Sequence, residues 1–115
     1  MESKKDNSEK IQELQILEQN LRAISMQKQQ IQIELNETLN ALEELKKTND
    51  EVYKMISGIM LKSSKEDLIK ELNEKKKIIE LRISSLTKQE DLIEAKSSEL
   101  RKELSFSNKT SDSEN

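Results

Sequence analysis

The sequence predicts a mainly α-helical fold, a long antiparallel two-helix coiled coil whose helices are joined by one β-hairpin. Only 32% of the 115 residues are hydrophobic and 37% are charged, whereas soluble domains have roughly 45–50% apolar and about 25% charged residues. Proline is absent and Gly58 is the only glycine, so almost nothing interrupts a helix. Leucine and isoleucine recur every seven residues in two long stretches, which is typical of coiled coils.

The first helix is expected over residues 8–48. With Leu14 at heptad position a, eight of the ten a and d positions are Leu or Ile. The ten are Leu14, Leu17, Leu21, Ile24, Lys28, Ile31, Leu35, Thr38, Leu42 and Leu45. Lys28 and Thr38 are the polar exceptions, and polar seam residues commonly fix the register of a coiled coil. Alternatively, Lys28 only lays its aliphatic stem along the seam.

The second helix is expected over residues 64–104, followed by a disordered tail over residues 105–115 that is rich in Ser, Asn, Asp and Lys. Ser63 and Glu66 have the spacing of a capping box, which predicts the start of the helix. An unbroken seven-residue repeat runs through Leu72, Ile79, Leu86, Ile93 and Leu100. The expected partner positions are mostly polar: Leu68, Lys75, Arg82, Gln89, Lys96 and Glu103. Ile69, Ile83 and Leu104 lie one residue further on and widen the stripe.

Residues 52–62 are expected to form the β-hairpin. Two apolar runs flank Ser57-Gly58, and glycine supplies the positive φ that a two-residue hairpin turn requires. The predicted hairpin residues are Val52, Tyr53, Met55, Ile56, Gly58, Ile59, Met60 and Leu61. A lone hairpin is marginal in water and exposes unpaired edges, so we expect other subunits to cover it. The alternative is a helix–helix loop that folds back on the coil.

The short connection between helices of matched length predicts an antiparallel pair, with both termini at one end and the hairpin at the other. One register consistent with the two stripes pairs Leu45 with Leu72, Thr38 with Ile79, Ile31 with Leu86, Ile24 with Ile93, and Leu17 with Leu100. The end that carries the termini is unusually apolar. Its residues are Ile11, Leu14, Ile16, Leu17, Leu21, Leu100, Leu104 and Phe106. The end of a coiled coil explains the leucines, but it explains Ile16 and Phe106 poorly.

Composition argues against several functions. The chain has no Cys and no His, so thiolate chemistry, the usual general base and the commonest metal ligands are missing, and no cofactor is expected. The net charge of −3 and the lack of a basic arm argue against nucleic acid. Lys75, Lys76 and Lys77 are flanked by glutamates at helical spacing. Without a signal peptide or an 18-residue apolar run, we expect a cytoplasmic protein outside the membrane.

The order of several short stretches resembles the β-type subunits of prefoldin, most closely the archaeal ones. The stretches are Leu21-Arg22-Ala23-Ile24 with Lys28-Gln29-Gln30, Asn36-Glu37-Thr38 with Ala41-Leu42-Glu43-Glu44-Leu45, Val52-Tyr53-Lys54 with Gly58 and Leu61, and Glu80-Leu81-Arg82-Ile83 with Leu86 and Lys88-Gln89-Glu90. The resemblance covers roughly residues 9–104. There is room for one hairpin only, whereas α-type subunits carry two.

The resemblance implies an ATP-independent co-chaperone subunit. In that family, two α and four β subunits join their hairpins into a double β-barrel body, and the helix pairs hang from it as tentacles. The apolar tips hold non-native clients, such as actin-like and tubulin-like proteins, and pass them to a group II chaperonin. Phe106 lies outside the matched stretches. The alternative function is a passive coiled-coil spacer or scaffold, and an enzyme is disfavoured.

Overall fold

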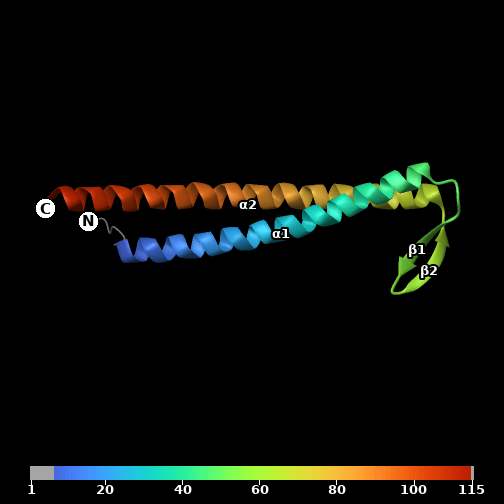
Figure 1. The fold of residues 1–115 in the computed structure, drawn as a ribbon, viewed down its shortest axis with the longest axis horizontal. Coiled ribbons are helices and arrows are strands. Elements are labelled where there is room, and N and C mark those ends of the chain that lie inside the picture. The colour runs from blue at the N-terminus through green and yellow to red at the C-terminus, as the bar shows by residue number, and fades with distance from the viewer. Residues whose placement is uncertain (1–6, 115) are drawn as a thin grey trace. The chain divides into compact units, whose positions relative to one another are not determined.

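The computed structural model describes residues 7–114, with side chains described over residues 7–106. As predicted, one two-stranded hairpin follows the first long helix in the chain and precedes the second (Figure 1). The elements are helix α1 (Asn7–Lys47), strand β1 (Val52–Ile56), strand β2 (Ile59–Ser63) and helix α2 (Lys65–Glu114). The chain divides into two units. We call residues 29–85 the hairpin unit, and residues 1–28 with 86–115 the terminal unit. Each unit contains a stretch of both helices.

The seam of α1 follows the predicted heptad. All ten predicted a and d positions are buried or half-buried, including the polar Lys28 and Thr38. Ile31, Thr38 and Leu42 are the most buried, with exposed fractions of 7%, 3% and 6%. Thr38 Oγ1 donates a hydrogen bond of 2.8 Å to the carbonyl oxygen of Glu34, so its buried hydroxyl is satisfied within its own helix.

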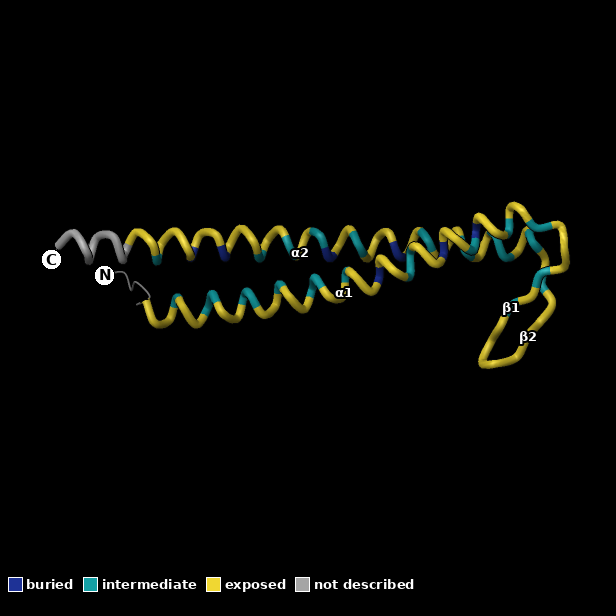
Figure 2. Tube along the Cα trace, in the orientation of Figure 1, coloured by how far each residue is buried: buried dark blue, intermediate teal, exposed yellow. Residues whose placement is uncertain are grey.

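The seam of α2 agrees with the sequence for one stripe and differs for the other. Ile79, Leu86 and Leu100 are buried, while Leu72 and Ile93 are half-buried (Figure 2). The expected partner stripe is wrong from Lys75 onward, because the predicted positions are exposed and the next residue of each heptad is covered instead. The covered residues are Lys76, Ile83, Glu90, Ser97 and Leu104. Ile83 and Leu104 were already expected to widen the stripe, but hydrophobicity could not identify the three polar residues.

Polar contacts around the connections fix where the helices end. After α1, the amide of Thr48 still donates to the carbonyl of Glu44 at 3.0 Å. Lys65 Nζ reaches back to the carbonyl oxygens of Lys46 and Thr48 at 3.4 and 3.1 Å, which satisfies acceptors left open at a helix C-terminus. The side chain of Lys65, the first residue of α2, therefore binds directly to the C-terminal end of α1.

The N-cap of α2 is Ser64 and not Ser63. The amide of Asp67 donates to Ser64 Oγ at 3.1 Å, and the amide of Leu68 donates to the Ser64 carbonyl at 3.0 Å. Ser63 is the last residue of β2 and pairs with Val52, so it is held in extended conformation one position before the cap.

Helix α2 also ends later than predicted. A disordered tail was expected over residues 105–115, but α2 continues to Glu114, and Asn115 lies outside the described residues. No proline or glycine follows Leu104, so the polar composition alone does not stop the helix.

The hairpin has the predicted two-residue turn. Strands β1 and β2 are antiparallel, and Ile56 pairs with Ile59 across the turn. Ser57 and Gly58 have φ values of 49° and 82°, and positive φ at both central residues matches the right-handed twist of the strands. The alternative of an irregular helix–helix loop is wrong. Within the hairpin unit, the two strands stand to one side of the helices (Figure 1).

Candidate functional site

The hairpin concentrates exposed apolar side chains. Six of them have exposed fractions from 46% to 65%: Tyr53, Met55, Ile56, Ile59, Met60 and Leu61. Val52 is half-buried. The sheet has two strands only, so in the described part of the chain both outer edges lack a neighbouring strand. Exposed edges beside apolar side chains are the features that lead one sheet to pair with another.

The two faces of the hairpin differ in chemistry. Side chains alternate between the two faces along a strand. The register therefore puts Val52, Lys54 and Ile56 of β1 on the same face as Ile59 and Leu61 of β2. The other face holds Tyr53, Met55, Met60 and Lys62. Lys54 Nζ forms an ion pair with the Glu71 carboxylate on the second turn of α2, so the Lys54 face is tied to that helix.

A small polar cluster closes the open end of the hairpin. The Glu51 carboxylate accepts hydrogen bonds from Lys62 Nζ at 3.0 Å and from the Tyr53 hydroxyl at 2.9 Å. These two donors, with Lys62 contributing more, lower the pKa of Glu51 below its ordinary value. The cluster orients the base of the hairpin. Because Glu51 is exposed, these contacts add little to the free energy of unfolding.

Ion pairs join the described segments of the two helices in the terminal unit. Lys10 Nζ lies 3.9 Å from Glu103 Oε2, and Glu18 Oε2 lies 3.2 Å from an Arg101 guanidinium nitrogen. Lys28 Nζ lies 2.7 Å from Glu90 Oε1. The order of the partners reverses between the helices, so the two segments run antiparallel. The Glu18–Arg101 and Lys28–Glu90 pairs fall within one or two residues of the predicted register.

The predicted apolar end residues fall into three groups of burial. Ile11, Ile16 and Phe106 are 47%, 57% and 74% exposed. The half-buried residues are Leu14, Leu17, Leu21 and Leu104. Leu100 is buried, at 7% exposed, so its side chain belongs to the seam and not to a free surface. Ile16 and Phe106, which coiled-coil packing explained poorly from the sequence, are the most exposed residues of this set.

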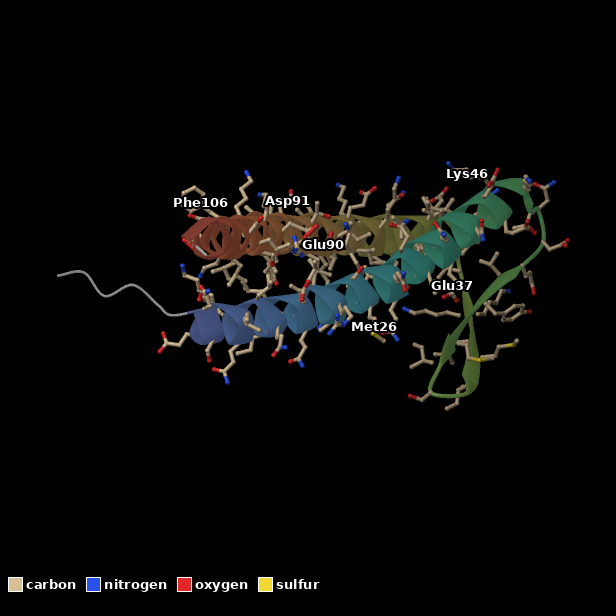
Figure 3. The ribbon with its side chains drawn as sticks, turned by 60° about the vertical axis from the view of Figure 1, so that its left-hand side comes forward. Met26, Glu37, Lys46, Glu90, Asp91 and Phe106 are labelled. Atoms are coloured by element: carbon tan, nitrogen blue, oxygen red, sulfur yellow. The ribbon has the colours of Figure 1, made fainter. Side chains whose placement is uncertain are left out.

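Two further apolar side chains of the terminal unit are open to solvent and do not belong to the predicted apolar end. Met26 and Leu92 are 66% and 72% exposed. Figure 3 shows Met26 on the side of α1 away from α2. Both lie outside the seam positions of their heptads, and that spacing was the available signal. The exposed apolar surface of the terminal unit therefore includes side chains further inside the helices, in addition to those near the helix ends.

Metal binding and membrane insertion can be examined in the part of the chain that the structure describes. Residues 7–106 contain no group of three or more acidic, His or Cys side chains placed to hold a metal ion. Among the described helices, none is both long and apolar enough to cross a bilayer. The candidate site therefore consists of two apolar surfaces, one on the hairpin and one on the helices of the terminal unit.

Comparison with known proteins assigns this fold to a class of chaperone subunits. A family model described as prefoldin subunit matches residues 8–109. Prefoldin subunit beta of Archaeoglobus fulgidus is 44% identical over 94 residues, which cover 80% of this chain and 81% of that protein. Its counterpart from Pyrococcus furiosus is 36% identical, with 80% of each chain covered.

A solved structure agrees with the sequence comparisons. The crystal structure of the prefoldin beta subunit from Thermococcus strain KS-1 superposes with a TM-score of 0.84. The match covers 88% of this chain and 90% of that chain, at 29% identity. The chain belongs to the prefoldin subunit family, and the resemblance to β-type subunits is confirmed by these relatives.

Proposed function

We propose that this chain is a β-type subunit of a prefoldin hetero-hexamer, with two α and four β subunits. It works without ATP as a co-chaperone in the cytoplasm, holding non-native polypeptides and delivering them to a group II chaperonin. In this role it performs no reaction, and neither nucleic acid nor membrane is a partner. The observation that carries the proposal is the exposure of Ile11, Ile16 and Phe106, in a chain of this family, on helices whose seam already buries Leu100.

Exposed apolar groups on helices suit the capture of unfolded chains. Burial of apolar surface contributes roughly 25 cal/mol per Å², without directionality, so a few isoleucine-sized contacts hold a client without selecting a sequence. Each contact is weak, and several subunits acting together increase the affinity by avidity. Because each contact is weak, transfer to a second chaperone needs no nucleotide.

The hairpin suits permanent assembly. Its six exposed apolar side chains and two free sheet edges lie within a few residues of one another. Main-chain pairing between hairpins would satisfy the edge groups, and the apolar side chains would form the shared core that 32% hydrophobic residues do not provide within one subunit.

Assembly is tested by mass. The full chain, mixed with an α-type prefoldin subunit, should form one species of the mass of two α and four β chains, measured by native mass spectrometry. A passive coiled-coil spacer would give the same masses with and without the α-type subunit, and that result would exclude the assembly proposal.

Client binding is tested on the assembled hexamer. Deletion of the first 18 residues and of everything after Glu99 should leave the hexamer intact and abolish suppression of aggregation of a chemically denatured test protein. A full-length comparison pairs Ile16→Ser with Ile78→Ser, because Ile16 and Ile78 are similarly exposed, at 57% and 60%, in different units. Ile16→Ser should weaken suppression and Ile78→Ser should not. Equal activity of all variants would refute the assignment of the client site to the terminal unit.

A further inference from the structure

We propose that the Lys28–Glu90 ion pair specifies how the two helices pair, fixing both the register and the choice of partner helix. This role goes beyond client binding and assembly. It rests on the placement of two opposite charges at facing seam positions, where a slip of one heptad or a parallel pair of identical helices would misplace at least one of them.

Both residues occupy seam positions. Lys28 stands at a in the heptad of α1, and Glu90 stands in the covered stripe of α2. Their side chains are 30% and 20% exposed, and Nζ and Oε1 are 2.7 Å apart. Figure 3 shows Glu90 between the helices, whereas the neighbouring Asp91 lies on the outer side of α2. Lys28 therefore does more than lay its stem along the seam, the alternative that its sequence position left open.

The ion pair defines the levels of the remaining seam residues. Moving one heptad along each helix from Lys28 and Glu90 brings Leu21 level with Ser97, and one heptad further brings Leu14 level with Leu104. All of these residues are buried or half-buried. A leucine or a serine can face several different residues of the opposite helix at such levels, so the apolar residues alone do not fix the register.

A slip of one heptad would misplace the charges. Sliding α2 so that Ser97 meets Leu14 would set the Glu90 carboxylate against Leu21, away from Lys28. Sliding it the other way would set the Lys28 ammonium against Ser97. A charge that is only 20–30% exposed loses favourable interaction free energy when its partner is removed, so both slips are disfavoured.

The same charges disfavour pairing of identical helices from two chains. In a parallel pair of α1 helices, Lys28 would face Lys28 at one level. In a parallel pair of α2 helices, Glu90 would face Glu90. Like charges at a seam level oppose association, whereas α1 with α2 brings the opposite charges together. A polar seam pair of this kind favours one arrangement over others at some cost in stability.

Disulfide trapping tests the proposal directly, because the natural chain has no cysteine. One reporter carries Leu21→Cys with Ser97→Cys, which lie at the same level in the observed register. The second carries Leu14→Cys with Ser97→Cys, which meet only after a one-heptad slip. Each reporter is placed in the otherwise unchanged full chain, in Lys28→Leu/Glu90→Leu, and in the charge-reversed Lys28→Glu/Glu90→Lys. Oxidation in dilute solution is followed by mass, with intramolecular and intermolecular disulfides counted separately.

We expect the same-level disulfide to dominate in the unchanged and charge-reversed chains. In the double-leucine variant, the slipped and intermolecular disulfides should rise roughly tenfold or more, since the penalty for a misplaced seam charge is gone. Circular dichroism confirms that each variant remains helical. The proposal is overturned if the double-leucine variant keeps the same-level disulfide alone, if the charge-reversed chain slips, or if the same-level reporter does not close in the unchanged chain.

Discussion

The hairpin unit and the terminal unit are built from the same two helices but bury them differently. In the hairpin unit, both helices supply deeply buried seam residues, with Ile31 and Leu42 from α1 and Ile79 from α2. In the terminal unit, the buried residues Leu86, Ser97 and Leu100 all belong to α2, and the facing leucines of α1 are only half-buried. Buried seam residues therefore come from both helices in the hairpin unit and from α2 alone in the terminal unit.

The two units also expose different apolar surfaces. The hairpin unit gathers most of its exposed apolar side chains on a small sheet with open edges, which suits a permanent interface that excludes water. The terminal unit spreads them over helices whose backbone groups are already hydrogen-bonded, so a contact there gains only side-chain burial. In the proposed function the hairpin serves assembly and the terminal unit serves client binding, and four predictions compare the two units.

The largest effect is expected from a charge in the hairpin. Ile59→Asp should prevent assembly with an α-type subunit, because a carboxylate buried in an apolar interface without a partner is very unfavourable. Helix content, measured by circular dichroism, should stay high, since the side chain of Ile59 is 62% exposed in the single chain. Ile16→Asp, at 57% exposure in the terminal unit, is the matched control and should assemble normally. A normal hexamer from Ile59→Asp would exclude the hairpin as the assembly surface.

Truncation of seam residues should distinguish how tightly the two units hold their helices. Ile79→Ala, at 3% exposure in the hairpin unit, should lower the free energy of unfolding by about 2–4 kcal/mol. Ile24→Ala makes the same change at a half-buried seam position of the terminal unit, and it should cost about half as much or less. Denaturant unfolding of the full chain measures both values. Equal losses would show that the two seams are equally tight.

Removal of a buried hydroxyl should change the free energy of unfolding by a smaller amount, and in the terminal unit it should raise this free energy. Ser97 is fully buried, and its Oγ finds no hydrogen-bond partner among the described residues. Ser97→Ala should raise the free energy of unfolding by about 1 kcal/mol, because it removes an unsatisfied polar group at nearly constant volume. In the hairpin unit, Thr38→Val removes a hydroxyl that is bonded to Glu34, so it should give little or no gain. Thermal unfolding measures both, and a gain only in Thr38→Val would contradict this account.

The sequence predicted the fold where hydrophobicity and backbone conformation agree. The leucine and isoleucine repeat located ten covered seam positions of α1, including Lys28 and Thr38, because the spacing of apolar neighbours also places the polar residues between them. Gly58 located the hairpin turn, since few residues other than glycine accept its positive φ. The same spacing placed Ile16 outside the seam.

Where polar residues decide the structure, the sequence was insufficient. Lys76, Glu90 and Ser97 are covered although nothing in their chemistry predicts it. Their burial depends on how the opposite helix lies against α2, which is a tertiary effect. Leu100 was expected both in the seam repeat and among the apolar residues of the end that carries the termini, and its burial agrees with the seam position.

The smallest predicted effect concerns the polar cluster at the base of the hairpin. Lys62 and Tyr53 lower the pKa of Glu51, so the contribution of the cluster is present above the ordinary carboxyl pKa and is lost as the pH falls through the lowered value. A titration followed by NMR should show the pKa of Glu51 rising in Lys62→Met and rising less in Tyr53→Phe, because Lys62 is the larger cause. A larger rise in Tyr53→Phe would reverse that assignment. Since Glu51 is fully exposed, added salt should reduce the lowering of its pKa by Lys62. Salt should not weaken the apolar contacts of the hairpin in this way.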